Sequence, residues 1–300
     1  MKVIKCHDVT KEHKGIKALD ELSFEIEENK ITGLIGRNGA GKTTLLKILA
    51  GLWKETSGEV QVFSKRPFNN LMVSANSLFV DDGMTFSNSL TLQELLKEAS
   101  TFYPNWDVEL ANRLFDYFQF EPKQIHERLS KGKKSTFNMI IGLSAKCALT
   151  IFDEPTTGMD AAVRKDFYRA LLKDYLAHPR TIIISSHHLD EIEDVLEDVL
   201  LINEGKQLMH KSIDDLKEYA VGLTGQSAIV RQWIGGKEVL YSQELGMDQS
   251  YVVVKNNFDR NAAERLGISV SAVAPSDLCV YLTGSNKGGI DDVFNSRNVR

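Results

Sequence analysis

The sequence predicts an α/β protein built around a parallel β-sheet. Short apolar runs of strand length alternate with amphipathic helical segments, a pattern typical of parallel β-α-β units. A glycine-rich loop joins one such run, Lys30 to Ile35, directly to a helix that begins at Lys42. Apolar residues make up 42% and charged residues 26% of the chain, a mixture that excludes a disordered or collagen-like protein.

The length of 300 residues favours two domains, because about 150 residues per domain is typical. Beyond Val221 the alternation of helices and buried strands gives way to short strands separated by Gly-Gly and Asp turns. We therefore expect a domain over residues 1–220 and a small C-terminal α+β appendage over residues 221–300. Dimer contact or regulation is one interpretation of the appendage, and a packing element without a ligand is the other.

Composition also restricts the cellular setting. The most apolar stretch, Phe137 to Phe152, contains Asn138, Ser144 and Lys146, so no transmembrane helix is predicted. Met1 to Asp8 carries charges where a signal peptide needs an apolar region. The net charge of −5 argues against a nucleic-acid partner. Three widely separated cysteines suggest neither a disulfide framework nor a zinc site, so a cytoplasmic protein is expected.

The elements of the first domain can be assigned in order. Val3 to Gly58 reads as strand, turn, strand, glycine loop and helix, with the helix over Lys42 to Leu52. Further strands are predicted at Ala148 to Phe152 and Thr181 to Ser185, on either side of a helix over Ala161 to Leu176.

Between these segments the period of apolar residues becomes helical, which predicts a helical subdomain over residues 88–145. Its aromatic residues are expected mainly in the helix core. A surface for a partner protein is the alternative interpretation. They are Phe102, Tyr103, Trp106, Phe115, Tyr117, Phe118 and Phe120.

The C-terminal part is assigned more briefly. An acidic run from Asp190 to Asp198 predicts a solvated amphipathic helix. Helical periodicity returns over Ile213 to Tyr219. The remaining segments read as three strands, a short helix and a last strand-like piece: Ser227 to Trp233, Lys237 to Gln243, Tyr251 to Lys255, Asn261 to Leu266 and the region of Val270.

The glycine-rich loop carries the strongest chemical signal. It matches the phosphate-binding pattern G-x-x-x-x-G-K-[ST], with a strand before it and a helix after it. Glycines let backbone N–H groups approach an anion, and the helix adds its positive end. Lys42 can reach the β- and γ-phosphates of a nucleotide, and the Thr43 hydroxyl can bind Mg²⁺. The loop reads Gly36, Arg37, Asn38, Gly39, Ala40, Gly41, Lys42, Thr43 and Thr44.

A pair of carboxylates follows a second apolar strand. Asp153 ends the run Leu149 to Asp153, where it can hold Mg²⁺ through water. Glu154 comes next and is placed to polarise an attacking water as general base. With the glycine loop, this pair predicts hydrolysis of a nucleoside triphosphate.

The motifs in this order resemble an ATP-binding cassette (ABC) ATPase over about residues 2–220. Leu129-Ser130-Lys131-Gly132-Lys133 is similar to the family's signature motif, usually Leu-Ser-Gly-Gly-Gln. The resemblance implies that Ser130 and Gly132 contact the γ-phosphate of ATP held by another subunit. It also implies that Asp160 links the two subunits' sites, and that His187 contacts the γ-phosphate and the attacking water. For the adjacent His188 a surface position is favoured.

Two positions depart from the family pattern. Where the family usually has a glutamine that senses Mg²⁺ and the membrane partner, this chain places Asp82, which can still ligate or water-bridge Mg²⁺. A solvated acidic loop is the alternative for Asp82. Where the family has an adenine-stacking aromatic residue, this chain has His13. An imidazole is a smaller stacking surface than a tyrosine ring. His13 either contacts adenine or does not, and the sequence favours neither alternative.

The resemblance implies an ATP-hydrolysing subunit that energises a transporter. Since no membrane span is predicted, the pathway must belong to a separate permease, with this chain on the inner face of the membrane and paired with a second cassette, identical or paralogous. The motifs resemble exporter-type cassettes that pair with ABC-2-like permeases, and within them the YtrB-like subgroup, associated with drug, antimicrobial-peptide or peptide efflux. The alternatives are a soluble ABC ATPase without a transport role and a regulatory, non-hydrolytic cassette.

Overall fold

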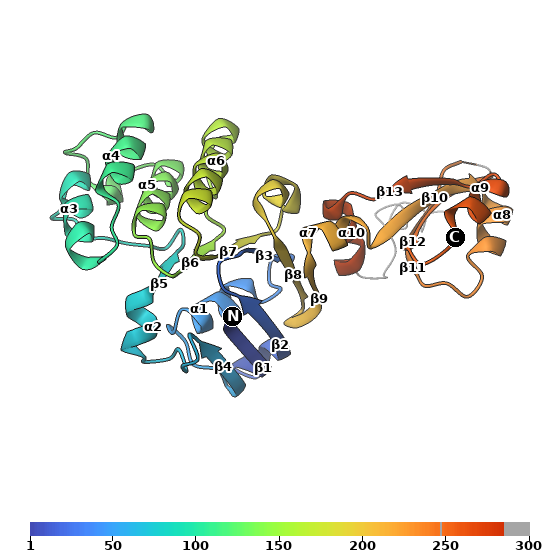
Figure 1. Ribbon diagram of the computed structural model, residues 1–300, viewed down its shortest axis with the longest axis horizontal. Coiled ribbons are helices and arrows are strands. Elements are labelled where there is room, and N and C mark those ends of the chain that lie inside the picture. The colour runs from blue at the N-terminus through green and yellow to red at the C-terminus, as the bar shows by residue number, and fades with distance from the viewer. Residues whose placement is uncertain (247, 285–300) are drawn as a thin grey trace, which may run out of the picture. The chain divides into compact units, whose positions relative to one another are not determined.

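A computed structural model describes residues 1–246 and 248–284 of the chain (Figure 1). The chain divides into two compact units, Met1–Asp214 and Asp215–Arg300, which are considered separately. The predicted boundary near Ala220 falls at the first strand of the second unit. Within the described residues no helix is long and apolar enough to cross a membrane.

The first unit is organised around a mostly parallel sheet, as the sequence predicts. Its central strands are buried along their whole length, so each is a continuous apolar run rather than an alternating one. The last strand is antiparallel to its neighbour, and the other pairings are parallel. The strands, in spatial order, are β5 (Ser77–Val80), β6 (Leu149–Asp153), β7 (Thr181–Ser186), β3 (Ile31–Ile35), β8 (Asp198–Asn203) and β9 (Lys206–Ser212).

A smaller antiparallel sheet lies beside α1 (Lys42–Leu49). Its strands run in the order β2 (Ile16–Glu27), β1 (Lys2–His13) and β4 (Ser57–Val62). Apolar side chains of this sheet and of α1 form one buried cluster, which also includes Leu34 of β3. The cluster holds the helix that follows the glycine loop between the two sheets.

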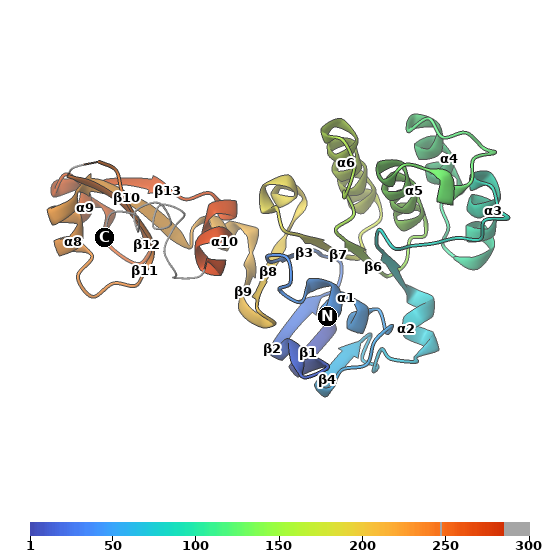
Figure 2. The same ribbon diagram turned by 180° about the vertical axis from the view of Figure 1, so that it is seen from behind.

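Helices α3 (Leu92–Phe102), α4 (Val108–Tyr117), α5 (Lys131–Ser144) and α6 (Ala161–Ala177) run side by side at one end of this unit (Figure 2). Thr91 and Glu94 form a capping box at the start of α3, which fixes where that helix begins. A short helix, α2 (Leu71–Asn76), precedes β5.

The aromatic residues of the helical subdomain are divided between its core and its surface. Phe115, Phe118 and Phe120 are buried in the helical core. Phe102 and Tyr117 are instead 76% and 61% exposed.

The expected helix over Asp190 to Asp198 does not form. Two 3₁₀ turns, Leu189–Glu191 and Glu193–Val195, occupy the segment instead, and β8 begins at Asp198. Leu189, Ile192 and Val195 are buried at a spacing of three residues, which matches the 3₁₀ repeat. The acidic residues between them are all at least partly accessible.

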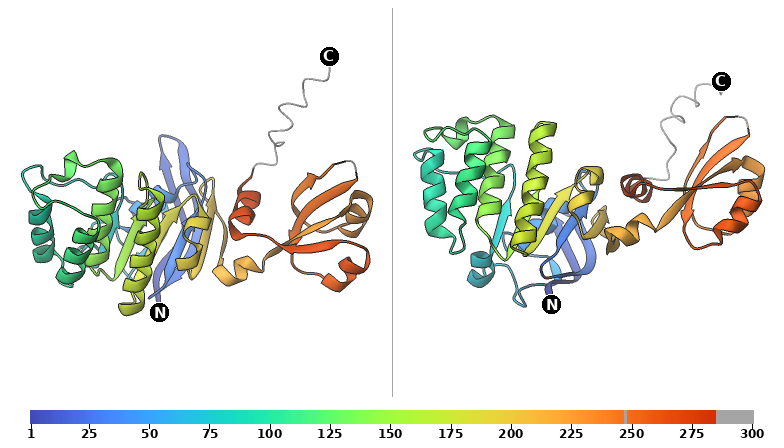
Figure 3. Two further views of the ribbon diagram at one scale, coloured as in Figure 1. Left: turned by 90° about the horizontal axis from the view of Figure 1, so that it is seen from above. Right: turned by 45° about the horizontal axis from the view of Figure 1, so that its top comes forward.

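The second unit contains a β-α-β-β-α-β motif (Figure 3). All its strand pairings are antiparallel, in the order β11-β12-β10-β13. Side chains of α8 and α9 join those of the sheet in one buried apolar cluster. The elements are α7 (Ile213–Lys217), which spans the division, then β10 (Ala220–Gln226), α8 (Ser227–Trp233), β11 (Val239–Glu244), β12 (Gln249–Lys255), α9 (Arg260–Arg265), β13 (Ser269–Ala272) and α10 (Pro275–Thr283).

The predicted strand over Ser227 to Trp233 is wrong, because this segment is helix α8. Ile229, Val230, Trp233 and Ile234 all contact the apolar cluster of the unit. Ile229 and Trp233, like Val230 and Ile234, are four residues apart, and this spacing places them on one helical face.

The cysteines lie buried and unpaired. Burial raises the pKa of the Cys147 thiol to about 11 and that of Cys279 to about 12. Neither thiol is therefore ionised near neutral pH.

Candidate functional site

The glycine-rich loop connects β3 to α1 and folds tightly against neighbouring backbone. Gly39 and Gly41 have φ values of 84° and 104°, a region that favours glycine. A Cβ added to Gly41 would lie 2.5 Å from the carbonyl oxygen of Ala18, so no other residue fits there without a shift. The sequence thereby keeps the loop narrow and directs it into the start of α1, where unpaired backbone N–H groups favour an anion.

The loop encloses an open cavity of about 230 Å³. The residues that line the cavity include most of those predicted to bind nucleotide, and also Glu154, which is predicted to act in catalysis. The cavity is lined by Ala18, Arg37, Asn38, Gly39, Ala40, Gly41, Lys42, Thr43, Thr44 and Glu154.

Lys42 is the central charge of this cavity. Its side chain is only 6% exposed, and Nζ donates a hydrogen bond to the Gly36 carbonyl oxygen at 2.7 Å. The same ammonium lies 3.2 Å from Oε1 of Glu154. A buried ammonium requires such partners, because desolvation otherwise disfavours its charged form.

Asp153 ends β6 at the edge of the sheet nearest the loop. Its Oδ1 accepts a hydrogen bond of 2.6 Å from the Ser185 hydroxyl on the adjacent strand, and the carboxylate is buried. The bond fixes the carboxylate orientation, a property that a carboxylate binding a metal through water requires.

Strand register places another carboxylate beside Asp153. Val80 of β5 is opposite Phe152 of β6, so Asp81 and Asp153 are the next residues of two neighbouring parallel strands. In parallel strands, residues in register point to the same face. Burial raises the pKa of Asp81; nearby Lys47 opposes this shift and Asp153 adds to it.

Asp82, the predicted metal ligand, is directed elsewhere. Its carboxylate lies 3.3 Å from Nζ of Lys131 and its side chain is 55% exposed. Of the two adjacent acids, Asp81 therefore lies beside Asp153 and Asp82 pairs with Lys131. Sequence reasoning missed Asp81 because it relied on spacing from the family pattern, and the end of strand β5 was the signal that would have found it.

The two residues predicted to act in catalysis are in contact. Nδ1 of His187 and Oε2 of Glu154 are 2.8 Å apart. The Glu154 backbone has a φ of 47°, and its N–H donates to the Ser185 hydroxyl at 2.9 Å. A non-glycine residue in this conformation is held by its surroundings, and such strain is common at functional sites. The ring of His188 lies 4.0 Å from that of His187, tilted by 47°.

Ser130, Gly132 and Asp160 form a separate group that does not line the loop cavity. Ser130 caps α5, where its hydroxyl accepts from the Lys133 N–H at 3.4 Å. A Cβ added to Gly132 would lie 2.3 Å from the carbonyl oxygen of Gly158, so the start of α5 presses against the segment before α6. Asp160 caps α6 by accepting from the Val163 N–H at 2.9 Å.

His13 lies at the end of β1, and its ring contacts that of Trp53 at 5.1 Å in an edge arrangement. It is not among the residues that line the loop cavity. Its contact with adenine stays a prediction.

The fold and this site define the class of P-loop nucleotide-binding ATPases. The family model described as ABC transporter matches residues 19–157. Bacitracin transport ATP-binding protein BcrA of Bacillus licheniformis is 32% identical, over 72% of this chain and 72% of its own length. ABC transporter ATP-binding protein YtrB of Bacillus subtilis (strain 168) is 28% identical, over 72% of this chain and 74% of its own. The chain belongs to the ABC transporter family, as an ATP-binding, ATP-hydrolysing member.

Solved structures agree on the fold. A structure of the ATP-binding subunit of an ABC transporter superposes with a TM-score of 0.64 at 22% identity, over 72% of this chain and 92% of the other. A dimeric ATP-binding cassette in a post-hydrolysis state, bound to ADP and Pi, gives a TM-score of 0.62 at 20% identity, over 70% of this chain and 98% of the other. At this level of identity the likeness shows the cassette fold.

Proposed function

We propose that this chain is the ATP-hydrolysing subunit that energises an exporter, with a drug, an antimicrobial peptide or another hydrophobic or peptide substrate. The observation that carries the hydrolytic part of the proposal is that Glu154 contacts both Lys42 of the phosphate-binding loop and His187. The similarity to BcrA, a bacitracin transport ATP-binding protein, supports this substrate class. Residues 1–220 form the cassette, including the helical subdomain over residues 88–145.

The roles of the chain's own residues follow from their positions. Lys42 and the backbone N–H groups of the loop bind the β- and γ-phosphates. The carboxylate of Glu154 accepts a proton from the attacking water, which makes the water a better nucleophile. The imidazole of His187 contacts that carboxylate and orients it beside the γ-phosphate.

Mg²⁺ fits the oxygen donors at this site. Among the described residues, no group of three or more His, Cys, Asp or Glu side chains could hold a metal ion by itself. Mg²⁺ normally takes one or two carboxylates, a hydroxyl, phosphate oxygens and water, so it does not need such a group. We assign it to Asp153 and Thr43, with Asp81 nearby. When bound, the ion neutralises charge on the phosphates.

The second group of predicted residues supports a dimer. Ser130, Gly132 and Asp160 lie outside the cavity that contains Lys42, which is consistent with contact to a nucleotide held by another cassette. The related dimeric cassette supports this arrangement. The partner is a second copy or a paralogue, and the C-terminal unit serves dimer contact or regulation.

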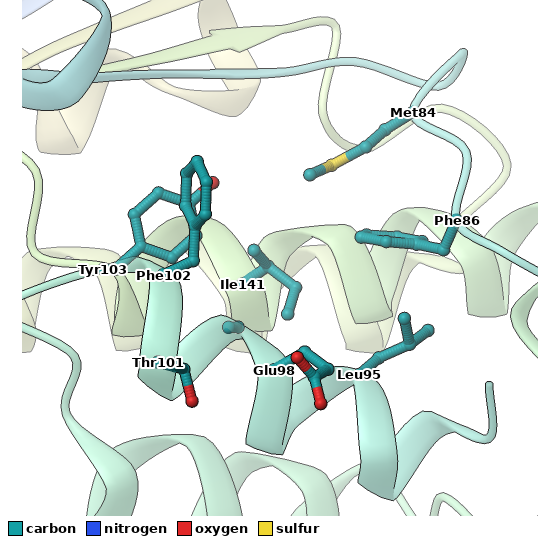
Figure 4. A pocket seen from close by; sticks show the side chains of 9 residues that line it. Met84, Phe86, Leu95, Glu98, Thr101, Phe102, Tyr103 and Ile141 are labelled. Carbon is teal, nitrogen blue, oxygen red and sulfur yellow. The ribbon is translucent and has the colours of Figure 1, made fainter.

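An apolar groove in the helical subdomain supports a membrane partner. It has a volume of about 360 Å³ and is lined by residues of the segment after Asp82, of α3 and Tyr103 that follows it, and by Ile141 of α5. Figure 4 shows Met84 and Phe86 on one side of it and Phe102 and Tyr103 on the other. We assign the groove to an apolar segment of the permease, which would place the chain at the inner face of the cell membrane.

The test of the proposed function has two readouts. Purified protein should release phosphate from ATP only with Mg²⁺, and membranes that contain its permease should retain the chain after a salt wash. Lack of ATP hydrolysis by folded, nucleotide-binding protein, alone or with the permease, would favour a regulatory cassette. Activity without any membrane association would favour a non-transport role.

A further inference from the structure

Glu154 and His187 belong to two segments that leave neighbouring strands of the central sheet. Glu154 follows β6, and His187 follows β7. Their side chains are 27% and 39% exposed, so burial alone does not fix either one. The proposed hydrolysis depends on their contact, because a catalytic group misplaced by about 1 Å can cost about 100-fold in rate. The contact therefore needs support from the residues around it.

The segment after His187 consists of two short 3₁₀ turns. Such turns have poorer hydrogen-bond geometry than an α-helix, so they depend more on contacts with their surroundings. On one side of the segment, Leu189, Ile192 and Val195 are buried. On another side, a cavity of about 320 Å³ lies between the turns and α6, and residues of both line it. Close packing is therefore interrupted between the turns and α6.

An ion pair joins the turns to α6 at this cavity. The carboxylate of Glu191, the last residue of the first turn, accepts a hydrogen bond from Nη1 of Arg164, in the first turn of α6. The side chains of Arg164 and Glu191 are 30% and 22% exposed, so water screens them less than a surface pair. Nε of Arg164 is buried and has no hydrogen-bond partner among the described residues. Loss of Glu191 would therefore leave a partly buried charge uncompensated.

Arg164 is also tied to the loop that begins at Glu154. Its backbone N–H donates to the Asp160 carbonyl oxygen at 3.0 Å, which begins the helical hydrogen bonding of α6. At the start of the loop, the Thr157 hydroxyl donates to the Glu154 carbonyl oxygen at 2.8 Å. The loop between Glu154 and α6 is therefore held at both ends by hydrogen bonds of its own.

The segments that follow β6 and β7 are thus joined twice, by Glu154 with His187 and by Arg164 with Glu191. We propose that Arg164 and Glu191 form a positioning pair, which holds the turn after His187 against α6 and so keeps the imidazole beside Glu154. Neither residue of the pair lines the phosphate-binding cavity, so neither is assigned a contact with the nucleotide. The inference rests on the proposed roles of Glu154 and His187 in hydrolysis.

The experiment measures steady-state ATP hydrolysis by the full chain, together with its permease if the chain alone is inactive. Glu191→Gln and Arg164→Gln should each lower kcat about 10- to 100-fold, the range expected when a catalytic group is misplaced. The double variant should lose little more than either single variant, because both substitutions break the same contact. KM for ATP should change less than about twofold, because no contact with the nucleotide is removed.

Arg169→Gln is the matched control. Arg169 lines the same cavity, but it is 66% exposed and lies 3.7 Å from Asp166 of its own helix. Its loss should change kcat less than about twofold, as for an exposed ion pair.

A second readout uses the His187→Gln background. There, Glu191→Gln should lower kcat less than about twofold further, because the imidazole that the pair positions is already absent. A pair that only stabilised the fold would lower the rate equally in both backgrounds. ATP affinity measured by calorimetry should equal that of the unaltered chain in all these variants.

Three results would overturn the inference while the proposed function stands. They are a rate for Glu191→Gln equal to that of Arg169→Gln, an equally large effect in the His187→Gln background, and loss of ATP binding in Glu191→Gln. If His187→Gln itself keeps the full rate, the role proposed for His187 fails and the inference fails with it.

Discussion

The ammonium of Lys42 lies 3.2 Å from Oε1 of Glu154, so the lysine of the phosphate-binding loop contacts the carboxylate proposed as general base. A phosphate and Glu154 therefore compete for the same cation. The contact links nucleotide binding to the carboxylate, because a phosphate that takes Lys42 leaves Glu154 with its contact to His187, 2.8 Å away.

Glu154→Gln should lower the rate of ATP hydrolysis about 10²- to 10⁴-fold, the usual contribution of a general base. ATP affinity should stay equal or rise, because glutamine lacks the charge that competes for Lys42. Steady-state phosphate release and calorimetry measure the two effects. Glu109→Gln, on an 80% exposed side chain of α4, is the control and should retain full activity. Unchanged hydrolysis in Glu154→Gln would refute the assignment of the base.

Lys42→Ala should weaken ATP binding about 10- to 100-fold, because hydrogen bonds to charged groups contribute about 1.5–3 kcal/mol. The variant also leaves Glu154 without its cation, which adds repulsion toward phosphate. Calorimetric titration with ATP measures the loss. Lys173→Ala, at an exposed position of α6, should bind like the unaltered chain. Equal affinity in Lys42→Ala would count against the phosphate-binding loop.

His187→Gln and His188→Gln form a matched pair, because the rings are neighbours and only His187 contacts Glu154. Loss of His187 should reduce the hydrolysis rate at saturating ATP at least about 10-fold while ATP affinity changes little. His188→Gln should retain most of the activity. Equal losses of hydrolysis rate in the two variants would show that the contact with Glu154 does not account for the contribution of His187 to hydrolysis.

Asp81→Asn and Asp82→Asn should separate the two adjacent carboxylates. Asp81 is next to Asp153 in strand register, so its loss should weaken Mn²⁺ binding to the ATP-bound protein severalfold, as measured by electron paramagnetic resonance. Asp82 pairs with Lys131, so Asp82→Asn should leave Mn²⁺ affinity unchanged. The opposite ranking would restore Asp82 as the residue near the metal.

Phe102→Ser should reduce retention of the chain by permease-containing membranes without lowering its melting temperature. The side chain lines the apolar groove and is 76% exposed, so little buried contact is lost. Leu71→Ser, in α2 and 87% exposed, is the control outside the groove. Equal retention of the two variants would show that the groove does not bind the permease.

The cassette fold and the phosphate-binding loop could be predicted because their residues are contiguous. The loop from Gly36 to Thr44 and the buried runs before it and before Asp153 carry their own local signals. Helix α8 was mistaken for a strand because its apolar residues were read as a short buried run rather than by their helical spacing.

The sequence by itself pointed to Lys42, Asp153 and Glu154, because glycine loops and carboxylates at the ends of apolar strands follow from local chemistry. Only the tertiary structure decided which residues meet. The β5–β6 register places Asp81 beside Asp153, and the packing of α5 on the loop before α6 brings Lys131 to Asp82. These contacts join residues 49 to 72 positions apart, and such distances are set by strand register and helix packing, which no local pattern encodes.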